Sequence, residues 1–141
     1  MLDSKRGADM RNSRALSKEA TKIFNKLISK IDPATGHVRI GKPGGVFMQV
    51  VVEKLPNREY SIAHYGEQNG DAMADPEMRF AIIDNEVYPI SVRMDYTGYY
   101  KDCAGDEYYE KGLPIFDIKE QADMASFANM WMRNIKHQQG I

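Results

Sequence analysis

The chain has 141 residues, of which 43% are apolar and 28% are charged, as is typical of one globular domain. Its formal net charge of -1 excludes a uniformly basic nucleic-acid binder, and its single cysteine excludes a disulfide framework within the chain. No apolar run approaches the roughly 20 residues of a membrane span, and the polar N-terminus lacks the apolar stretch of a secretory signal. We therefore expect a cytoplasmic protein without a membrane partner.

The start of the chain divides into an arm and a helix. Residues 1–12 show no apolar periodicity, which predicts a flexible arm before a single domain over 13–141. Apolar residues then recur at three- and four-residue steps over 14–31. This spacing predicts an amphipathic helix that has Ser13 or Ser17 as its N-cap and packs its apolar stripe against the rest of the domain.

The middle of the chain has the pattern of strands joined by turns. Alternating apolar residues and β-branched composition predict five strands, at 37–40, 46–54, 59–65, 77–83 and 86–94. Asp84-Asn85 predicts a two-residue hairpin turn, and Pro89 predicts either an edge strand or a bulge. Tyr99-Tyr100 favours a further short strand before a longer loop.

The last predicted element is a helix over 118–138. Asp117 and Glu120 predict a capping box at its start, and Gly140 ends it. Its predicted core stripe consists of Ala122, Phe127, Met130, Trp131 and Ile135. The order of elements predicts an α+β fold, with an antiparallel sheet of about five strands flanked by an N-terminal and a C-terminal helix packed on one face.

Strand patterning breaks at 66–75, between two strands that are predicted to be neighbours, although hairpin loops usually need about two to five residues. Three interpretations remain open. Asn69 and Asp71 tie the loop together by hydrogen bonds to its backbone, or the loop is an acidic and aromatic surface that recognises a partner, or it binds a metal ion. The candidate metal ligands are His64, Glu67, Asp71, Asp75 and Glu77, whose spacing matches neither an EF-hand nor a two-histidine zinc site.

Two strings in the chain resemble a known family. Residues 61–82 read SIAHYGEQNGDAMADPEMRFAI, and residues 127–136 of the closing helix read FANMWMRNIK. They are similar to small proteins of unknown function from bacterial plasmids, phages and integrative elements, which share the motif SIAHYxEQNGDxMxDPEMxF and a C-terminal FAxxWxxNIKxQ helix. The similarity covers roughly 46–140, and the family has an aromatic residue where this chain has Gly66. The resemblance implies a mobile-element context and no particular activity.

The two signs of charge are separated along the chain. Residues 1–45 carry ten Lys or Arg against four acids, and residues 46–141 carry nine against sixteen. Within the first predicted helix a basic ridge repeats every four residues, at Arg14, Lys18, Lys22, Lys26 and Lys30. This ridge is either the solvent face of an amphipathic helix or a surface that binds phosphate groups.

Acidic loops that also carry tyrosines favour a non-enzymatic binding module of a phage or mobile element. Such a module would occlude a host or element protein, for example a defence nuclease, in the manner of anti-CRISPR or anti-restriction proteins. The predicted partner-binding residues are His64, Tyr65, Glu67, Asn69, Asp71, Asp75, Glu77, Asp95 and Tyr96. One alternative is a nucleic-acid-binding accessory protein that uses the basic ridge, and another is a metal-dependent hydrolase that uses His64 and the acidic loop. The leading hypothesis assigns no catalytic residue and no cofactor.

Overall fold

The computed structural model describes residues 13–103 and 118–141, which form two helices and six strands. The helices are α2 (Lys18–Ser29) and α4 (Ile118–Gln139). The strands are β1 (His37–Ile40), β2 (Val50–Leu55), β3 (Glu59–Gln68), β4 (Asp71–Ile83), β5 (Glu86–Met94) and β6 (Tyr99–Asp102). The predicted arm at 1–12 and the predicted capping residue Asp117 lie outside the described residues.

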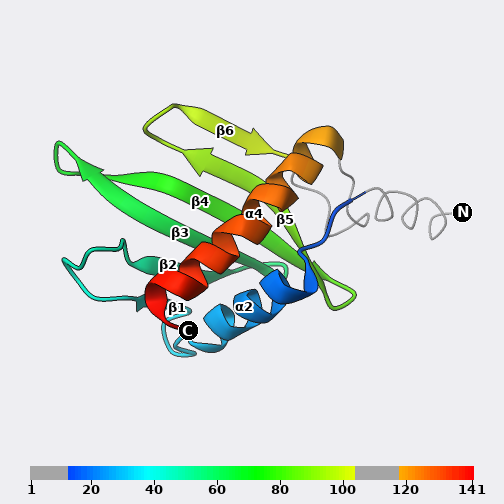
Figure 1. The fold of residues 1–141 in the computed structure, drawn as a ribbon, viewed down its shortest axis with the longest axis horizontal. Helices are drawn as coiled ribbons and strands as arrows, with labels where there is room; N and C mark the ends of the chain where they lie inside the picture. Colours follow the sequence, from blue (N-terminus) through cyan, green and yellow to red (C-terminus); the bar gives the residue numbers. More distant parts are fainter. Residues whose placement is uncertain (1–12, 104–117) are drawn as a thin grey trace, which may run out of the picture.

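The strands form one antiparallel sheet in the order of the chain, β1-β2-β3-β4-β5-β6. Both helices pack against one face of this sheet. Helix α4 crosses that face diagonally, and α2 lies next to α4 (Figure 1). The predicted α+β class and the placement of both helices on one face are therefore confirmed. The sheet has six strands rather than about five, because Tyr99–Asp102 pairs with β5 as a strand of its own.

Helix α2 starts later than its apolar spacing predicts. Ser17 is the N-cap, and its Oγ accepts a hydrogen bond from the Ala20 amide at 3.1 Å. The residues before it do not join the helix, because the Leu16 amide donates to the Val87 carbonyl of β5 at 2.8 Å. The Ser17 amide donates to Asn129 Oδ1 at 2.9 Å, which ties the start of α2 to α4.

The second strand begins at Val50, not at residue 46 as the alternation of apolar residues predicts. Strand β1 ends at Ile40, the partner of Val50, and the pairing of β2 with β3 also ends at Val50, opposite His64, where the β3–β4 register is irregular. The residues before Val50 form a loop over 41–49. Two glutamines hold this loop, with Gln49 Nε2 donating to the Gly41 carbonyl at 2.9 Å and Gln139 Nε2 donating to the Met48 carbonyl at 3.0 Å.

The prediction of a ten-residue loop at 66–75 is wrong. Strand β3 continues to Gln68 and β4 starts at Asp71, so that only Asn69 and Gly70, with φ of 54° and 85°, make the turn. The pairing register shifts between Ala63 and Tyr65, and this irregularity interrupts the alternation of apolar residues. The other predicted hairpin turn is confirmed, since Asp84 and Asn85 adopt φ of 52° and 67°.

Pro89 lies beside a register irregularity, since it pairs with Phe80 while Ser91 pairs with Arg79. Strand β5 is an interior strand, with β4 on one side and β6 on the other. The Pro89 carbonyl accepts a hydrogen bond from the fully buried Gln121 side chain of α4 at 3.1 Å. The same amide exchanges two hydrogen bonds with the backbone of Arg14, at 2.7 and 2.8 Å. Gln121 therefore joins α4, β5 and the segment before α2, with its polar atoms satisfied.

The core lies between the sheet and the two helices. Phe24 of α2 contacts Tyr60 and Phe80 of the sheet, with ring centroids 5.9 and 5.3 Å apart. Trp131 of α4 is 5% exposed, and Met130 beside it is 44% exposed, so the predicted placement of Met130 in the core stripe is wrong. The buried face of α4 instead consists of Gln121, Met124, Ala125, Ala128, Trp131, Met132 and Ile135.

Candidate functional site

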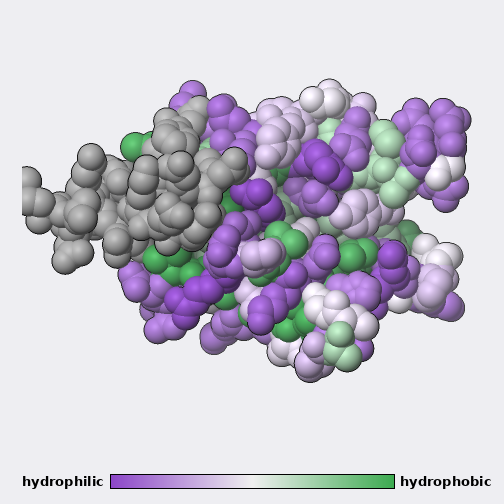
Figure 2. All heavy atoms as spheres, turned by 180° about the vertical axis from the view of Figure 1, so that it is seen from behind, coloured by the Kyte–Doolittle hydropathy of each residue, from purple (hydrophilic) through white to green (hydrophobic). Residues whose placement is uncertain are grey.

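The face of the sheet opposite the helices is the open face, and charged side chains cross it from strand to strand. Arg79 of β4 lies between two carboxylates, with Nε 3.0 Å from Glu59 Oε1 and Nη2 3.2 Å from Asp102 Oδ2. Figure 2 shows that hydrophilic residues predominate on this side of the molecule, with smaller apolar areas between them. These ion pairs connect β3, β4 and β6, so we assign them a structural role within the sheet.

A second network on the open face contains three residues that we predicted to bind a partner. The Tyr65 hydroxyl donates to Glu77 Oε2 at 2.7 Å. Arg93 lies between the Glu77 and Asp95 carboxylates, at 3.6 and 3.2 Å. Burial and the hydrogen bond to Glu77 raise the pKa of Tyr65 well above its usual value, which keeps the phenol protonated as a donor. Tyr65, Glu77 and Asp95 thus bond to one another or to Arg93.

His64 faces the opposite way, toward α4. It is 7% exposed, its Nδ1 lies 3.0 Å from the Gln49 carbonyl, and its ring meets Trp131 edge-on at 5.5 Å. The Glu77 side chain projects from the other face of the sheet, so the structure does not bring these two candidate metal ligands together. Within 13–103 and 118–141, no cluster of three or more His, Cys, Asp or Glu side chains is placed to hold a metal ion. His64 is a packed core residue.

Three connections lie at one end of the sheet, because every second turn of an antiparallel sheet lies at the same end (Figure 1). We call this the loop end and define it as the loop 41–49, the β3–β4 tip at 67–71 and the β5–β6 turn at 95–98. Glu67, Asn69 and Asp71 are exposed at the tip, and Asp75 is half-buried behind it. None of the three acids forms an ion pair with another described residue. The structure therefore confines the exposed part of the predicted acidic loop to a narrow hairpin tip.

The β3–β4 hairpin, just behind its tip, and the β5–β6 turn are fixed to each other. Asp95 Oδ2 accepts a hydrogen bond from the Ala74 amide at 2.7 Å, and the Asp95 amide donates to the Ala74 carbonyl at 2.9 Å. The Tyr96 hydroxyl occupies the space that a Cβ at Gly66 would fill. A side chain at this position would therefore have to displace Tyr96. Of the predicted partner-binding residues, Tyr96 is the aromatic one that is exposed at this end.

The loop end also carries an apolar segment that the sequence analysis missed. Val46 is 95% exposed, Phe47 49% and Met48 36%. The alternation of Val46 and Met48 with the residues of β2 predicts a strand here, and this prediction is wrong because β2 begins at Val50. The preceding Pro43-Gly44-Gly45 run was the available signal, since such a run favours a loop over an extended strand.

The five basic residues of the predicted ridge are all exposed: Arg14, Lys18, Lys22, Lys26 and Lys30. Two of them, Lys22 and Lys26, line a groove between α2 and α4 together with Lys136. Glu19 also lies in this groove, and its carboxylate is 3.5 Å from Arg133 Nη1. The structure thus extends the ridge onto α4, which spacing along α2 cannot reveal.

Residues 18–141 match the family described as a domain of unknown function, DUF6908. The chain belongs to this family. The match includes both helices and all six strands described above, so the DUF6908 domain is the whole of this fold. No curated protein and no solved structure matches the chain. Among the described residues no helix has the length and apolar composition to cross a membrane.

Proposed function

We propose that this DUF6908 domain is a binding module that engages a basic protein partner through its loop end. The observation that carries the proposal is the coincidence of two features at one end of the sheet. The most exposed large apolar side chain of the described residues, Val46, lies at the same end as the exposed acids Glu67 and Asp71. A surface that combines exposed apolar and charged residues has the composition of a protein interface, with an apolar centre and a charged rim.

The charges at the loop end favour a basic partner. From Glu59 to Met78 the chain carries five acids and no lysine or arginine. Glu77 and Glu59 of this set pair with arginines on the open face. The tip acids, Glu67 and Asp71, remain available to a partner. Lys42 in the loop 41–49 is the neighbouring cation. Exposed carboxylates of this kind accelerate association with a positively charged surface.

The hairpin that carries the tip is attached to the β5–β6 turn in the free protein. The hydrogen bonds between Asp95 and Ala74 fix the β5–β6 turn, and Tyr96 packs over Gly66 of β3. A surface that is ordered in advance loses less conformational entropy on binding. The predicted structural role of Asn69 fits this picture, since its φ of 54° makes the turn from which Glu67 and Asp71 project.

A nucleic-acid-binding enzyme is the partner class that we favour. Carboxylates spaced over a surface can replace the phosphates that such an enzyme binds, and its basic groove would complement the loop end. The resemblance to proteins of plasmids, phages and integrative elements supports a host defence nuclease or an element protein as this partner. Occlusion of the groove would then inhibit the enzyme without any chemistry by the DUF6908 domain.

Affinity capture from a bacterial extract tests the proposal when it compares matched variants. The loop-end variant is Glu67→Gln/Asp71→Asn, and the control is Glu53→Gln/Asp84→Asn, which removes two exposed acids outside the loop end. We expect a basic nucleic-acid-binding protein to be retained by the parent and the control and to be lost from the loop-end variant. Retention by all three proteins, or capture of no basic protein, would contradict the proposal.

The groove between α2 and α4 supports a second candidate function, direct binding of nucleic acid. Lys22, Lys26 and Lys136 converge there from two helices, and such a cluster can contact successive phosphates. An electrophoretic shift that falls steeply with salt, and that disappears in Lys22→Gln/Lys26→Gln, would support this function. Absence of a shift at about 50 mM salt would remove it, because electrostatic binding is strongest at low ionic strength.

A further inference from the structure

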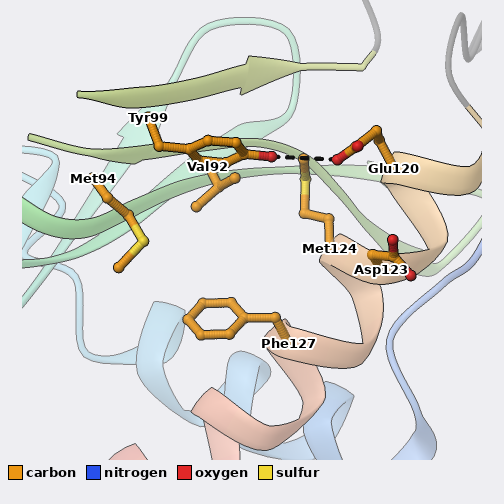
Figure 3. A pocket seen from close by; sticks show the side chains of 7 residues that line it. All are labelled: Val92, Met94, Tyr99, Glu120, Asp123, Met124 and Phe127. Carbon is orange, nitrogen blue, oxygen red and sulfur yellow. Dashed lines mark hydrogen bonds between the residues drawn. The ribbon is translucent and has the colours of Figure 1, made fainter. Parts of the chain in front are cut away.

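A pocket lies between the β5–β6 edge of the sheet and helix α4 (Figure 3). Its volume is about 210 Å³. Val92 and Met94 line it from β5, and Met124 and Phe127 line it from α4, with their side chains directed toward one another across the space. The floor is therefore apolar, and it includes two flexible thioethers and an aromatic ring.

The rim of this pocket is acidic and aromatic. Tyr99 of β6 donates a hydrogen bond to Glu120 Oε2 at 3.3 Å, and Asp123 lies one helical turn beyond Glu120 and is exposed. Burial and the negative charge of Glu120 raise the pKa of Tyr99. Lys101 acts on Tyr99 in the opposite direction but does not line the pocket. The rim thus combines two carboxylates with the face of a phenol, above an apolar floor.

We propose that this pocket binds the side chain of a lysine or arginine, which would come from the basic partner of the proposed function. The alkyl stem would lie along the apolar floor, and the cation would sit at the rim beside Glu120 and Asp123. Lysine and arginine bury their methylene groups in this way while their charge stays at a polar boundary. Charge-assisted hydrogen bonds to carboxylates and the face of Tyr99 both favour a cation at that position.

The location of the pocket links it to the loop end. Met94 and Tyr99 flank the β5–β6 turn at 95–98, so the pocket begins where the loop end finishes. A partner seated on the tip acids and on Tyr96 would therefore have the pocket within reach along the same edge. In this respect the inference rests on the proposed function, although the chemistry of the pocket can be tested without the partner.

The test uses the nine methionines of the chain as reporters. In protein labelled with carbon-13 at the methionine methyl groups, n-pentylamine is titrated as a lysine mimic and 1-pentanol as its uncharged counterpart. We expect the Met94 and Met124 signals to shift to saturation with the amine, and the Met48 and Met130 signals to stay in place. The alcohol should bind at least about tenfold more weakly, since it lacks the charge that the rim selects.

Variants of the rim decide which groups carry the selection. Glu120→Gln/Asp123→Asn should weaken binding of the amine about tenfold and leave binding of the alcohol within about twofold. The glutamine can still accept the hydrogen bond from Tyr99, so the pocket should keep its shape. Glu67→Gln/Asp71→Asn serves as the control, because these residues are distant from the rim, and it should bind the amine as the parent does.

Three outcomes would overturn the proposal. The first is no saturable shift of the Met94 and Met124 signals. The second is equal binding of the amine and the alcohol, which would identify a site for neutral apolar ligands. The third is unchanged binding of the amine to the rim variant. If the pocket fails this test while the loop-end variant loses the captured partner, only the pocket proposal is wrong, and the proposed function stands.

Discussion

The helix-covered face of the sheet and the loop end differ in what their side chains do. On the covered face Phe24, Phe80 and Trp131 are buried against one another or their neighbours, and the polar His64 has a hydrogen-bonding partner. At the loop end Val46 is almost fully exposed, and the exposed side chains of Glu67 and Asp71 form no ion pair with a described residue. This difference predicts that stability depends on the covered face and that the proposed binding depends on the loop end, so each should respond to a different set of variants.

The largest effect is expected in the core. Trp131→Ala removes a ring that packs on His64 and Phe127, and it leaves a cavity beneath α4. Removal of a large buried aromatic costs about 3–5 kcal/mol of unfolding free energy. Urea denaturation would measure this loss. An unchanged urea midpoint would show that α4 contributes little to the core, and it would contradict the assignment of stability to the covered face.

The open face should show an intermediate effect, and it offers an internal control. Arg79 contacts Glu59 and Asp102 and is 28% exposed, whereas Arg93 contacts Glu77 and Asp95 and is 44% exposed. Arg79→Met should cost about 1.5–3 kcal/mol, because the charge-assisted contacts it removes are shielded from water. Arg93→Met should cost about 0–1 kcal/mol, as for an exposed ion pair. Thermal or urea denaturation of both variants checks the order, and the reverse order would contradict it.

Alkaline pH should weaken the fold through a tyrosine of β5. Burial and the hydrogen bond to Glu86 raise the pKa of Tyr88 to about 12. Because this pKa is higher in the folded than in the unfolded protein, Tyr88 stabilises the fold fully at a pH below its unfolded pKa of about 10. This stabilisation is lost as the pH rises toward the pKa of the folded protein. Unfolding free energies measured between about pH 9 and 12 should therefore fall. The unfolding free energy of the Tyr88→Phe variant should fall less over this range, and an equal fall in both proteins would refute the role of Tyr88.

The smallest effect on stability is expected at Gly66. A methyl group there meets the Tyr96 hydroxyl, which is the end of an exposed side chain and can move aside. Gly66→Ala should therefore cost less than about 1 kcal/mol, while it displaces Tyr96 from the hairpin. In the Tyr96→Ala background the same substitution should have no cost, and a double-mutant cycle measures the coupling. A coupling of zero would show that Tyr96 does not pack on Gly66.

Local rules of sequence predicted the parts of the fold that depend on neighbours in the chain. The Asp84-Asn85 turn and the Ser17 N-cap follow from the preferences of those residues. Alternation failed where long-range pairing decides the outcome, at Val46, which has no partner strand, and at 66–75, where the register shifts. The predicted site was scattered because its residues lie on both faces of the sheet. Glu77 is the partner of Ala63, so the next residue, His64, projects from the opposite face, and only the order of the strands brings the loop 41–49 to the same end as the tip.

The central claim is that the loop end recognises a basic protein, and the association rate of the captured partner tests it most directly. The rate constant is measured for the parent, the Glu67→Gln/Asp71→Asn variant and the Glu53→Gln/Asp84→Asn control over a range of salt concentrations. We predict that the loop-end variant associates more slowly and with a weaker dependence on salt, while the control matches the parent and all three proteins melt alike. Equal association rates and equal salt dependence for all three proteins would contradict the account.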